Sequence, residues 1–295
     1  MRDAPVIRTI GALAHGALLE SGGRIELLDG ESAAAYATAA GHVIWIGHCH
    51  TTLHPRAVVL ERRVERLAAA AFVVDGIEPW RAAMPATIDA PSQVRERAET
   101  LRARMLATES PRGFAMLLRG DAPPFPLARA FPDVEALAVA CAADDADAAC
   151  RAALPLLGLG PGLTPSGDDL VGAAFFARRA LSSRASDAAR WSRAGGHLAQ
   201  ASDAQAHPIA AALFRDLVLG ATFAPLHRLA AAIACNSDAP TAAARELIAI
   251  GHSSGWDMLA GFLVAITGRV HDSVLGIQHG SPAGKTMEPI DPVHA

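Results

Sequence analysis

Aromatic residues, lysine and paired cysteines are all scarce in this 295-residue chain. Phe, Trp and Tyr together make up 5% of it, and Lys285 is the single lysine beside many arginines. The four cysteines show no CxxC spacing, so the sequence gives no sign of a disulfide framework or a zinc finger; they are Cys49, Cys141, Cys150 and Cys235. We therefore expect ordinary thiols in a reducing compartment.

Long apolar runs and basic patches are missing as well. No apolar run approaches the ~18 residues that cross a bilayer, and no leader-like segment stands at the N-terminus, so we expect a cytoplasmic protein without membrane contact. The net charge is −4, and no basic stripe interrupted by aromatics occurs, which argues against nucleic acid as a partner. The net charge does not exclude a small anionic ligand. Hydrophobic residues make up 51% of the chain, enough for a substantial core.

The first part of the chain has the pattern of short strands. Runs rich in β-branched and aromatic residues alternate with Gly, Asp or Pro, which is typical of a small antiparallel barrel or sandwich. The runs are Arg24 to Leu28, His42 to Ile46, Ala57 to Leu60 and Phe72 to Val74. From Ser92 to Leu106 the apolar spacing instead predicts an amphipathic helix, with Ser92 as its cap.

A proline-rich passage at Asp121 to Pro132 is the predicted domain boundary, because closely spaced prolines interrupt helices and central strands. The sequence that follows this passage predicts helices. The sequence thus predicts an α+β protein: a β-rich domain with one helix over residues 1–120, barrel-like or sandwich-like, then a helical domain over 133–271 and a poorly ordered tail over 272–295. The predicted helices are Val134 to Leu156, Asp169 to Leu181, Ala188 to Ala201, Pro208 to Leu219, Leu226 to Ala234, Thr241 to Ile250 and Trp256 to Thr267.

The segment GLGPGLTPSGDD, Gly158 to Asp169, is the most informative stretch of the sequence. Glycines allow close backbone approach, prolines stiffen the path, and Ser166 is a predicted N-cap for the apolar helix that follows. The segment matches neither GxxxxGK[ST] nor GxGxxG. A helix start offers amide donors to phosphate or carboxylate, so we predict anion-binding residues here: Gly160, Gly162, Leu163, Thr164, Ser166, Gly167 and Asp169.

A second copy of this pattern occurs near the C-terminus, where Ser254, Gly255 and Asp257 repeat the Ser-Gly-x-Asp of the first segment. Both copies precede apolar helices. We therefore hypothesise that two helix starts converge on one anion, with Ser253, Ser254, Gly255 and Asp257 as the second half of the site. A separation of more than about 20 Å, roughly two helix diameters, would exclude this hypothesis.

The acids in the two copies are not equivalent. Asp169 and Asp257 fall at the N3-like position, where a carboxylate either caps its own helix or binds a ligand. Asp168 has no counterpart, because Trp256 occupies the matching position. It is the predicted site of chemistry, as a hydrogen-bond acceptor, a base or a magnesium ligand, the alternative being an exposed helix-start acid. His252, in the second turn, is the other predicted catalytic residue, as a proton shuttle or donor to an anion.

Histidines His48, His50 and His54 suggest a metal site only superficially, since no nearby acid completes a ligand set. A metal-dependent hydrolase using His48, His50 and Asp168 is the corresponding alternative. No metal or cofactor is predicted beyond the magnesium option at Asp168. Hydroxyls, amides and carboxylates favour anion binding and electrostatic stabilisation over covalent catalysis.

The segments GLGPGLTPSGDDLVGAAFF and IGHSSGWDMLAGFLVAI resemble the two hallmark segments of the AllH family, a formerly uncharacterised family that includes a component of oxamate carbamoyltransferase. The resemblance implies a carbamoyltransferase of purine and allantoin catabolism that acts with partner subunits. It would convert oxalurate and phosphate to oxamate and carbamoyl phosphate, all small anions. The alternative is a non-catalytic subunit that binds an anion or a CoA-type metabolite and assembles or regulates a larger enzyme.

Overall fold

The computed structural model describes residues 26–27, 35–39, 42–48, 52–60, 80, 82, 84–162, 164–203, 206–235 and 239–271. The strands are β1 (Glu26–Leu27), β2 (Ala35–Ala39), β3 (His42–His48) and β4 (Ala57–Leu60). The helices are α2 (Pro91–Thr108), α3 (Ala115–Arg119), η1 (Leu127–Ala130), α4 (Phe131–Ala142), α5 (Ala146–Ala153), η2 (Leu154–Leu156), α6 (Ser166–Ala180), α7 (Ala185–Asp203), α8 (Pro208–Val218), α9 (Ala224–Ala234), α10 (Pro240–Ile248) and α11 (Ser254–Thr267).

The described part of the chain is mainly helical, so the predicted α+β class with a β-rich, barrel-like or sandwich-like half is wrong. Its strands form one small sheet of order β1-β2-β3-β4, antiparallel except for the parallel β3–β4 pair. No second sheet faces it among the described residues, and Phe72 to Val74 lies outside them. Short apolar runs do not reveal how many strands will pair, and this explains the error.

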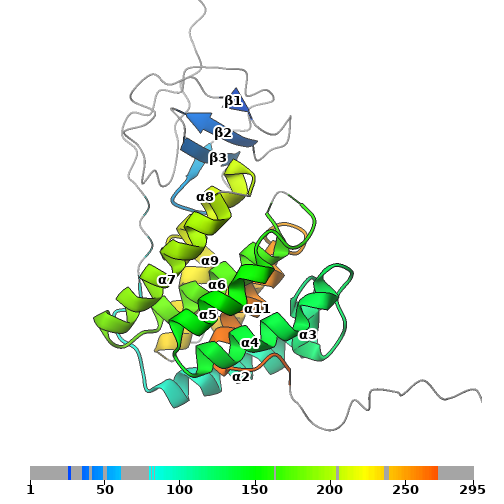
Figure 1. The fold of residues 1–295 in the computed structure, drawn as a ribbon. Coiled ribbons are helices and arrows are strands. Elements are labelled where there is room, and N and C mark those ends of the chain that lie inside the picture. The colour runs from blue at the N-terminus through cyan, green and yellow to red at the C-terminus, as the bar shows by residue number, and fades with distance from the viewer. Residues whose placement is uncertain are drawn as a thin grey trace, which may run out of the picture.

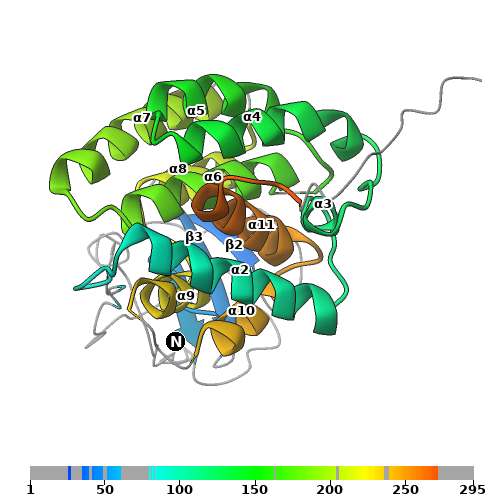
Figure 2. The same ribbon diagram turned by 90° about the horizontal axis from the view of Figure 1, so that it is seen from below.

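Helices α6 and α11 form the centre of the helical body, between α4, α5 and α7 on one side and α2, α9 and α10 on the other (Figure 2). Every residue of α11 from Gly255 to Thr267 is buried. The two central helices cross very closely, because a Cβ at Gly261 would lie 1.9 Å from the carbonyl oxygen of Leu170. Close contact between the two helices therefore depends on a glycine.

The helices from α2 onward share this core. Val94, Leu101 and Met105 of α2 are buried in the same apolar cluster as Phe175 of α6 and Phe262 of α11. The predicted boundary at residues 121–132 covers most of the passage between α3 and α4, including η1, and the first two residues of α4. The predicted tail, residues 272–295, lies outside the described residues.

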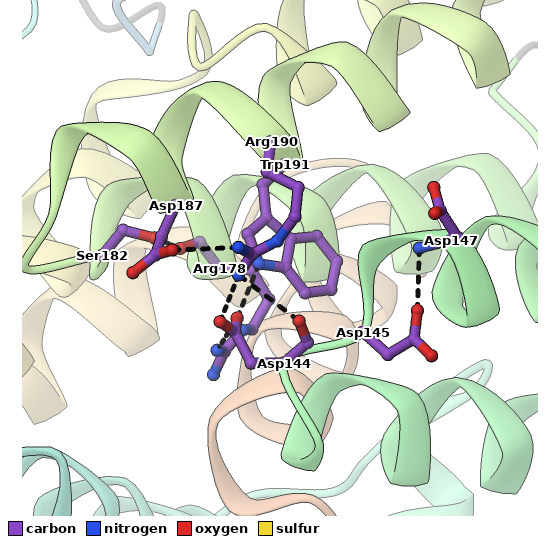
Figure 3. A network of polar contacts seen from close by, with 8 residues as sticks. All are labelled: Asp144, Asp145, Asp147, Arg178, Ser182, Asp187, Arg190 and Trp191. Atoms are coloured by element: carbon purple, nitrogen blue, oxygen red, sulfur yellow. Dashed lines mark hydrogen bonds and ion pairs between the residues drawn. The ribbon is translucent and has the colours of Figure 1, made fainter.

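A polar network ties the turn between α4 and α5 to α6 and α7 (Figure 3). Asp144, which has a φ of 55°, forms ion pairs with Arg178 and Arg190. It also accepts a 2.8 Å hydrogen bond from Nε1 of Trp191. This turn divides the predicted helix Val134 to Leu156 into α4, α5 and η2.

Two helices begin at residues other than those that the sequence predicts. Helix α2 begins at Pro91, with Ala90 rather than Ser92 at the N-cap position. Helix α6 begins at Ser166 itself, so Ser166 is not its N-cap, and neither α6 nor α11 has a side-chain cap hydrogen bond. No described helix is both long and apolar enough to cross a membrane.

Candidate functional site

The two Ser-Gly turns meet in the folded chain. Oγ1 of Thr164, just before α6, lies 3.0 Å from Oγ of Ser254, the first residue of α11. Residues 90 positions apart in sequence are thus in hydrogen-bond contact. The helix starts converge as the repeated motif predicts, while ligand binding between them stays a prediction.

Each turn contains a glycine because backbone passes too close for any side chain. A Cβ at Gly167 would lie 1.8 Å from the carbonyl oxygen of Leu156, and one at Gly255 would lie 1.9 Å from that of Leu247. The amide of Gly167 donates to Leu159 O at 2.8 Å, and that of Gly255 donates to Ile250 O at 3.0 Å. The sequence repeat is therefore also a repeat of backbone geometry.

These hydrogen bonds change what the helix starts can offer a ligand. The amides of Asp168 and Asp169 both donate to Pro165 O, at 3.0 and 3.2 Å, and that of Asp257 donates to Ser253 O at 2.8 Å. Five amides at the two helix starts, where we predicted anion binding, thus already have backbone acceptors. Side-chain hydroxyls and carboxyl groups are the other polar groups at this junction.

Asp257 is fully buried where the two helix starts meet the loop before α3. Its Oδ1 accepts a 2.6 Å hydrogen bond from the amide of Phe114. Burial raises the pKa of this carboxyl to about 7, against the lowering effect of hydrogen bonds from Phe114, Ser166 and Ser253. Gly113 has a φ of +55°, and a Cβ there would lie 2.2 Å from Oδ1 of Asp257, so a glycine admits the carboxyl.

Asp169 is the counterpart of Asp257 on α6. Burial, and then the nearby charge of Asp257, raise its pKa well above the usual range, while hydrogen bonds from Ser254 and Thr164 lower it. In each case one of the hydroxyls that lower the pKa belongs to a serine of the other helix start, since Ser166 acts on Asp257 in the same way. Two neighbouring carboxyls do not both ionise readily, so the proximity of Asp257 favours the protonated form of Asp169.

Asp168 is buried at 4% exposure and is not the exposed acid that one alternative predicted. Its Oδ1 accepts a 2.7 Å hydrogen bond from the amide of Gly158 and so holds the glycine loop against α6. Its Oδ2 has no hydrogen-bond partner in the described structure, and neither does Oδ2 of Asp169. Burial raises the pKa of Asp168 as well. Buried acceptors without donors are costly and mark candidate ligand contacts.

A cavity of about 230 Å³ opens beside this junction. Its polar wall comes from the two helix starts, and its apolar wall comes mainly from α8. The lining residues are His54, Thr164, Asp168, Asp169, Ala210, Leu213, Phe214, Leu217, Thr222, Phe223, Ile250, Gly251, Ser254 and Met258. No Arg or Lys is among these described lining residues. The site therefore combines hydrogen-bond acceptors, hydroxyls and an apolar surface.

The segment before β4 supplies His54, which the sequence suggested only as a doubtful metal ligand. Nδ1 of His54 accepts from the amide of Arg56 at 3.1 Å, and the ring packs on Phe223 with centroids 4.7 Å apart. Burial, followed by the nearby charge of Arg56, lowers its pKa to about 3. His54 is therefore neutral at physiological pH.

The remaining predicted site residues either do not line the cavity or lie outside the described residues. Gly160 and Gly162 have φ of 114° and 105°, which explains a glycine at each position, and Leu163 lies outside the described residues. His252 is exposed, does not line the cavity, and its carbonyl accepts a 3.2 Å hydrogen bond from Nη1 of Arg112.

The histidine cluster is only partly described. His48 is described in its backbone alone, and His50 lies outside the described residues. Over the part of the chain that the structure describes, no group of three or more His, Cys, Asp or Glu side chains is placed to hold a metal ion. The magnesium option at Asp168 stays a prediction.

Sequence reasoning missed Arg112, Gly113 and Phe114 because nothing in their local pattern points to a residue 143 positions away.

The comparisons with known proteins concern the segment that contains both Ser-Gly turns. Residues 156–266 match the family model described as oxamate carbamoyltransferase subunit AllH. No curated protein and no solved structure matches the chain.

Proposed function

We propose, from the match to the oxamate carbamoyltransferase subunit family, that this chain is a subunit of an enzyme that converts oxalurate and phosphate to oxamate and carbamoyl phosphate, a step of allantoin degradation. One observation carries the proposal. The matched segment contains both Ser-Gly turns, and the Thr164–Ser254 contact joins them at the wall of a cavity of suitable size for a small substrate.

The chemistry of the cavity suits the carbamoyl end of such a substrate. A carbamoyl group carries an NH₂ with two donors, and the Oδ2 atoms of Asp168 and Asp169 are acceptors without donors. The hydroxyls of Thr164 and Ser254 lie in the same lining and can donate to a carbonyl oxygen. The helix starts add the positive ends of their dipoles, which favour the negative charge of the substrate.

The proposed reaction needs a proton at one defined atom. An oxygen of phosphate attacks the carbamoyl carbon of oxalurate, the bond from that carbon to the oxamate nitrogen breaks, and the nitrogen takes up a proton. Asp169 lines the cavity, and burial and the nearby charge of Asp257 raise its pKa, so we assign the donor role to Asp169. Asp257 thus favours the protonated form of Asp169, and Asp168 orients the NH₂ group. Orientation and proton transfer then account for the chemistry without a nucleophilic side chain.

Charge explains why a partner subunit is part of the proposal. Phosphate brings more than one negative charge, yet no Arg or Lys lines the cavity among the described residues. Arg112 and His252 lie just beyond Gly251, at the exposed start of α11. We assign them to the approaching anion, with further cations supplied by a partner protein.

Reconstitution tests the proposal. The chain is assayed alone and together with the proteins encoded beside its gene, measuring carbamoyl phosphate formed from oxalurate and phosphate. We expect turnover only in the mixture. Turnover by the partners without this chain would make it an accessory subunit, and absence of turnover in every mixture would reject the carbamoyltransferase assignment.

Asp168→Asn gives a residue-level check of the same proposal. The amide oxygen still accepts from Gly158, so the loop is retained, but an NH₂ group, which is a donor, replaces the unpaired acceptor Oδ2. We expect oxalurate affinity to fall at least 10-fold, a loss of about 1.4 kcal/mol. Asp147→Asn, an exposed acid in the first turn of α5, is the matched control. Equal affinity of both variants would remove Asp168 from the site.

A further inference from the structure

We infer that His54 is a substrate-binding residue, whose Nε2–H donates to an oxygen of a ureido ligand while the N–H groups of that ligand bind the carboxyls of Asp168 and Asp169. The choice of ureido ligand rests on the proposed function. The role of His54 itself rests on the geometry of the cavity, and it lies outside the segment that matches the family model.

His54 is held rigidly in the cavity wall by the segment that carries it. The carbonyl of Leu53 accepts a 2.8 Å hydrogen bond from the amide of Ala224, at the start of α9. Arg56 forms a two-pronged ion pair with Asp216 of α8, with Nη2 to Oδ1 at 2.9 Å. These contacts join the segment before β4 to the helical body, where α8 approaches the sheet (Figure 1). A ring fixed in this way is preorganised for binding.

The hydrogen bonding of the ring determines which nitrogen carries the proton. Nδ1 accepts from the amide of Arg56, so it bears no hydrogen, and the neutral ring must be protonated at Nε2. The side chain is 1% exposed and lines the cavity. Its N–H at Nε2 is therefore a donor in a cavity whose other ionisable lining groups, Asp168 and Asp169, are carboxyls.

The combination of groups selects a class of ligand. Carboxyl oxygens without donors call for N–H groups, and the His54 N–H and the Thr222 hydroxyl call for an oxygen acceptor in the same molecule. The apolar side chains of Phe214, Phe223 and Met258 in the lining suit contact with a planar conjugated group. An acylated urea such as oxalurate has all three properties, whereas oxalate lacks the N–H groups.

Two variants separate hydrogen bonding from packing. His54→Phe keeps an aromatic ring against Phe223 but removes the donor, and His54→Gln restores a side-chain N–H. Binding of oxalurate and oxalate to the full chain is measured by calorimetry, with melting temperature as the check on folding. His197→Phe, at an exposed position of α7, is the matched control.

We expect oxalurate to bind the parent chain and oxalate to bind at least 10-fold more weakly. His54→Phe should lose about 10-fold in oxalurate affinity, and His54→Gln should recover part of it, as expected for one hydrogen bond. Unchanged oxalurate affinity in a folded His54→Phe chain, or equal affinity of the parent chain for oxalate, would overturn the inference.

The outcomes also separate this inference from the proposed function. In the reconstituted enzyme His54→Phe should raise KM for oxalurate and leave KM for phosphate and kcat nearly unchanged. Binding of oxalurate without any turnover would reject the carbamoyltransferase and keep the His54 site. Turnover with an unaltered oxalurate KM in His54→Phe would keep the carbamoyltransferase assignment and reject the His54 site.

Discussion

At the scale of single residues, the site depends on carboxyls whose surroundings oppose ionisation. Asp257 is fully buried and Asp169 is half-buried, and hydrogen bonding from a serine of the opposite helix start lowers the pKa of each against the raising effect of burial. This reciprocity gives the Ser and Asp that recur in both turns a role between the two helices, and Ser253 acts on Asp257 within its own helix start as well.

The raised pKa of Asp257 predicts a dependence of stability on pH. A carboxyl with a pKa near 7 in the folded chain and near 3.8 in the unfolded chain stabilises the fold fully below about pH 4. This contribution is lost as the pH rises through 7. The free energy of unfolding should therefore fall between pH 5.5 and pH 8.5, and the raised pKa of Asp169 acts in the same direction.

Asp257→Asn tests this dependence. The amide oxygen still accepts from Phe114, but no proton is lost as the pH rises. We expect the variant to exceed the parent chain by about 1 to 3 kcal/mol in unfolding free energy at pH 8.5. The two should be closer at pH 5.5 when measured by denaturant titration. An equal loss of stability with pH in both proteins would show that Asp257 is not the responsible group.

At the scale of elements, the geometry of the site follows from three close backbone crossings. Gly167 passes the end of η2, Gly255 passes α10, and Gly261 crosses α6, each within reach of a carbonyl oxygen. The same crossings bring Thr164 and Ser254 into contact. A bulky residue at Gly167 would therefore disrupt the fold as well as any ligand contact, and it is unsuitable as a test of binding.

Alanine substitutions measure the importance of these crossings. Gly167→Ala places a methyl group 1.8 Å from Leu156 O and should destabilise the chain by about 2 kcal/mol or more. At Gly196, inside α7, a methyl group would meet no described neighbour within 4 Å, so Gly196→Ala should stabilise by ~0.5 to 1 kcal/mol. Thermal unfolding of the Gly167→Ala and Gly196→Ala variants measures both changes in stability. A neutral Gly167→Ala would mean that α6 does not require this close approach.

At the scale of the whole molecule, the sequence predicted local features well and long-range assembly poorly. The helices and the repeated Ser-Gly-x-Asp pattern follow from apolar spacing and turn residues. The structure contains the helices close to the predicted positions and brings the two copies of the pattern together. The fold class was wrong because four short strands pair into one small sheet while the described chain is mainly helical. Strand number and partner choice are set by contacts that no local pattern records.

The parts of the site that sequence reasoning could not place are those from distant segments. Phe114 reaches Asp257 across 143 positions, and Arg56 reaches Asp216 across 160. The second contact fixes His54 in the cavity wall. Local composition gives neither pairing, since both depend on how α2, α3 and the segment before β4 pack on the C-terminal helices.

The central claim is that the cavity at the two helix starts is the substrate site of a carbamoyltransferase subunit. A crystal structure of the chain with its partner subunits and oxalurate tests it most directly. We predict ligand density in the cavity, with ureido nitrogens on Asp168 and Asp169 and an oxygen on Nε2 of His54. An occupied oxalurate site elsewhere in the assembly, with this cavity free of ligand, would contradict the account.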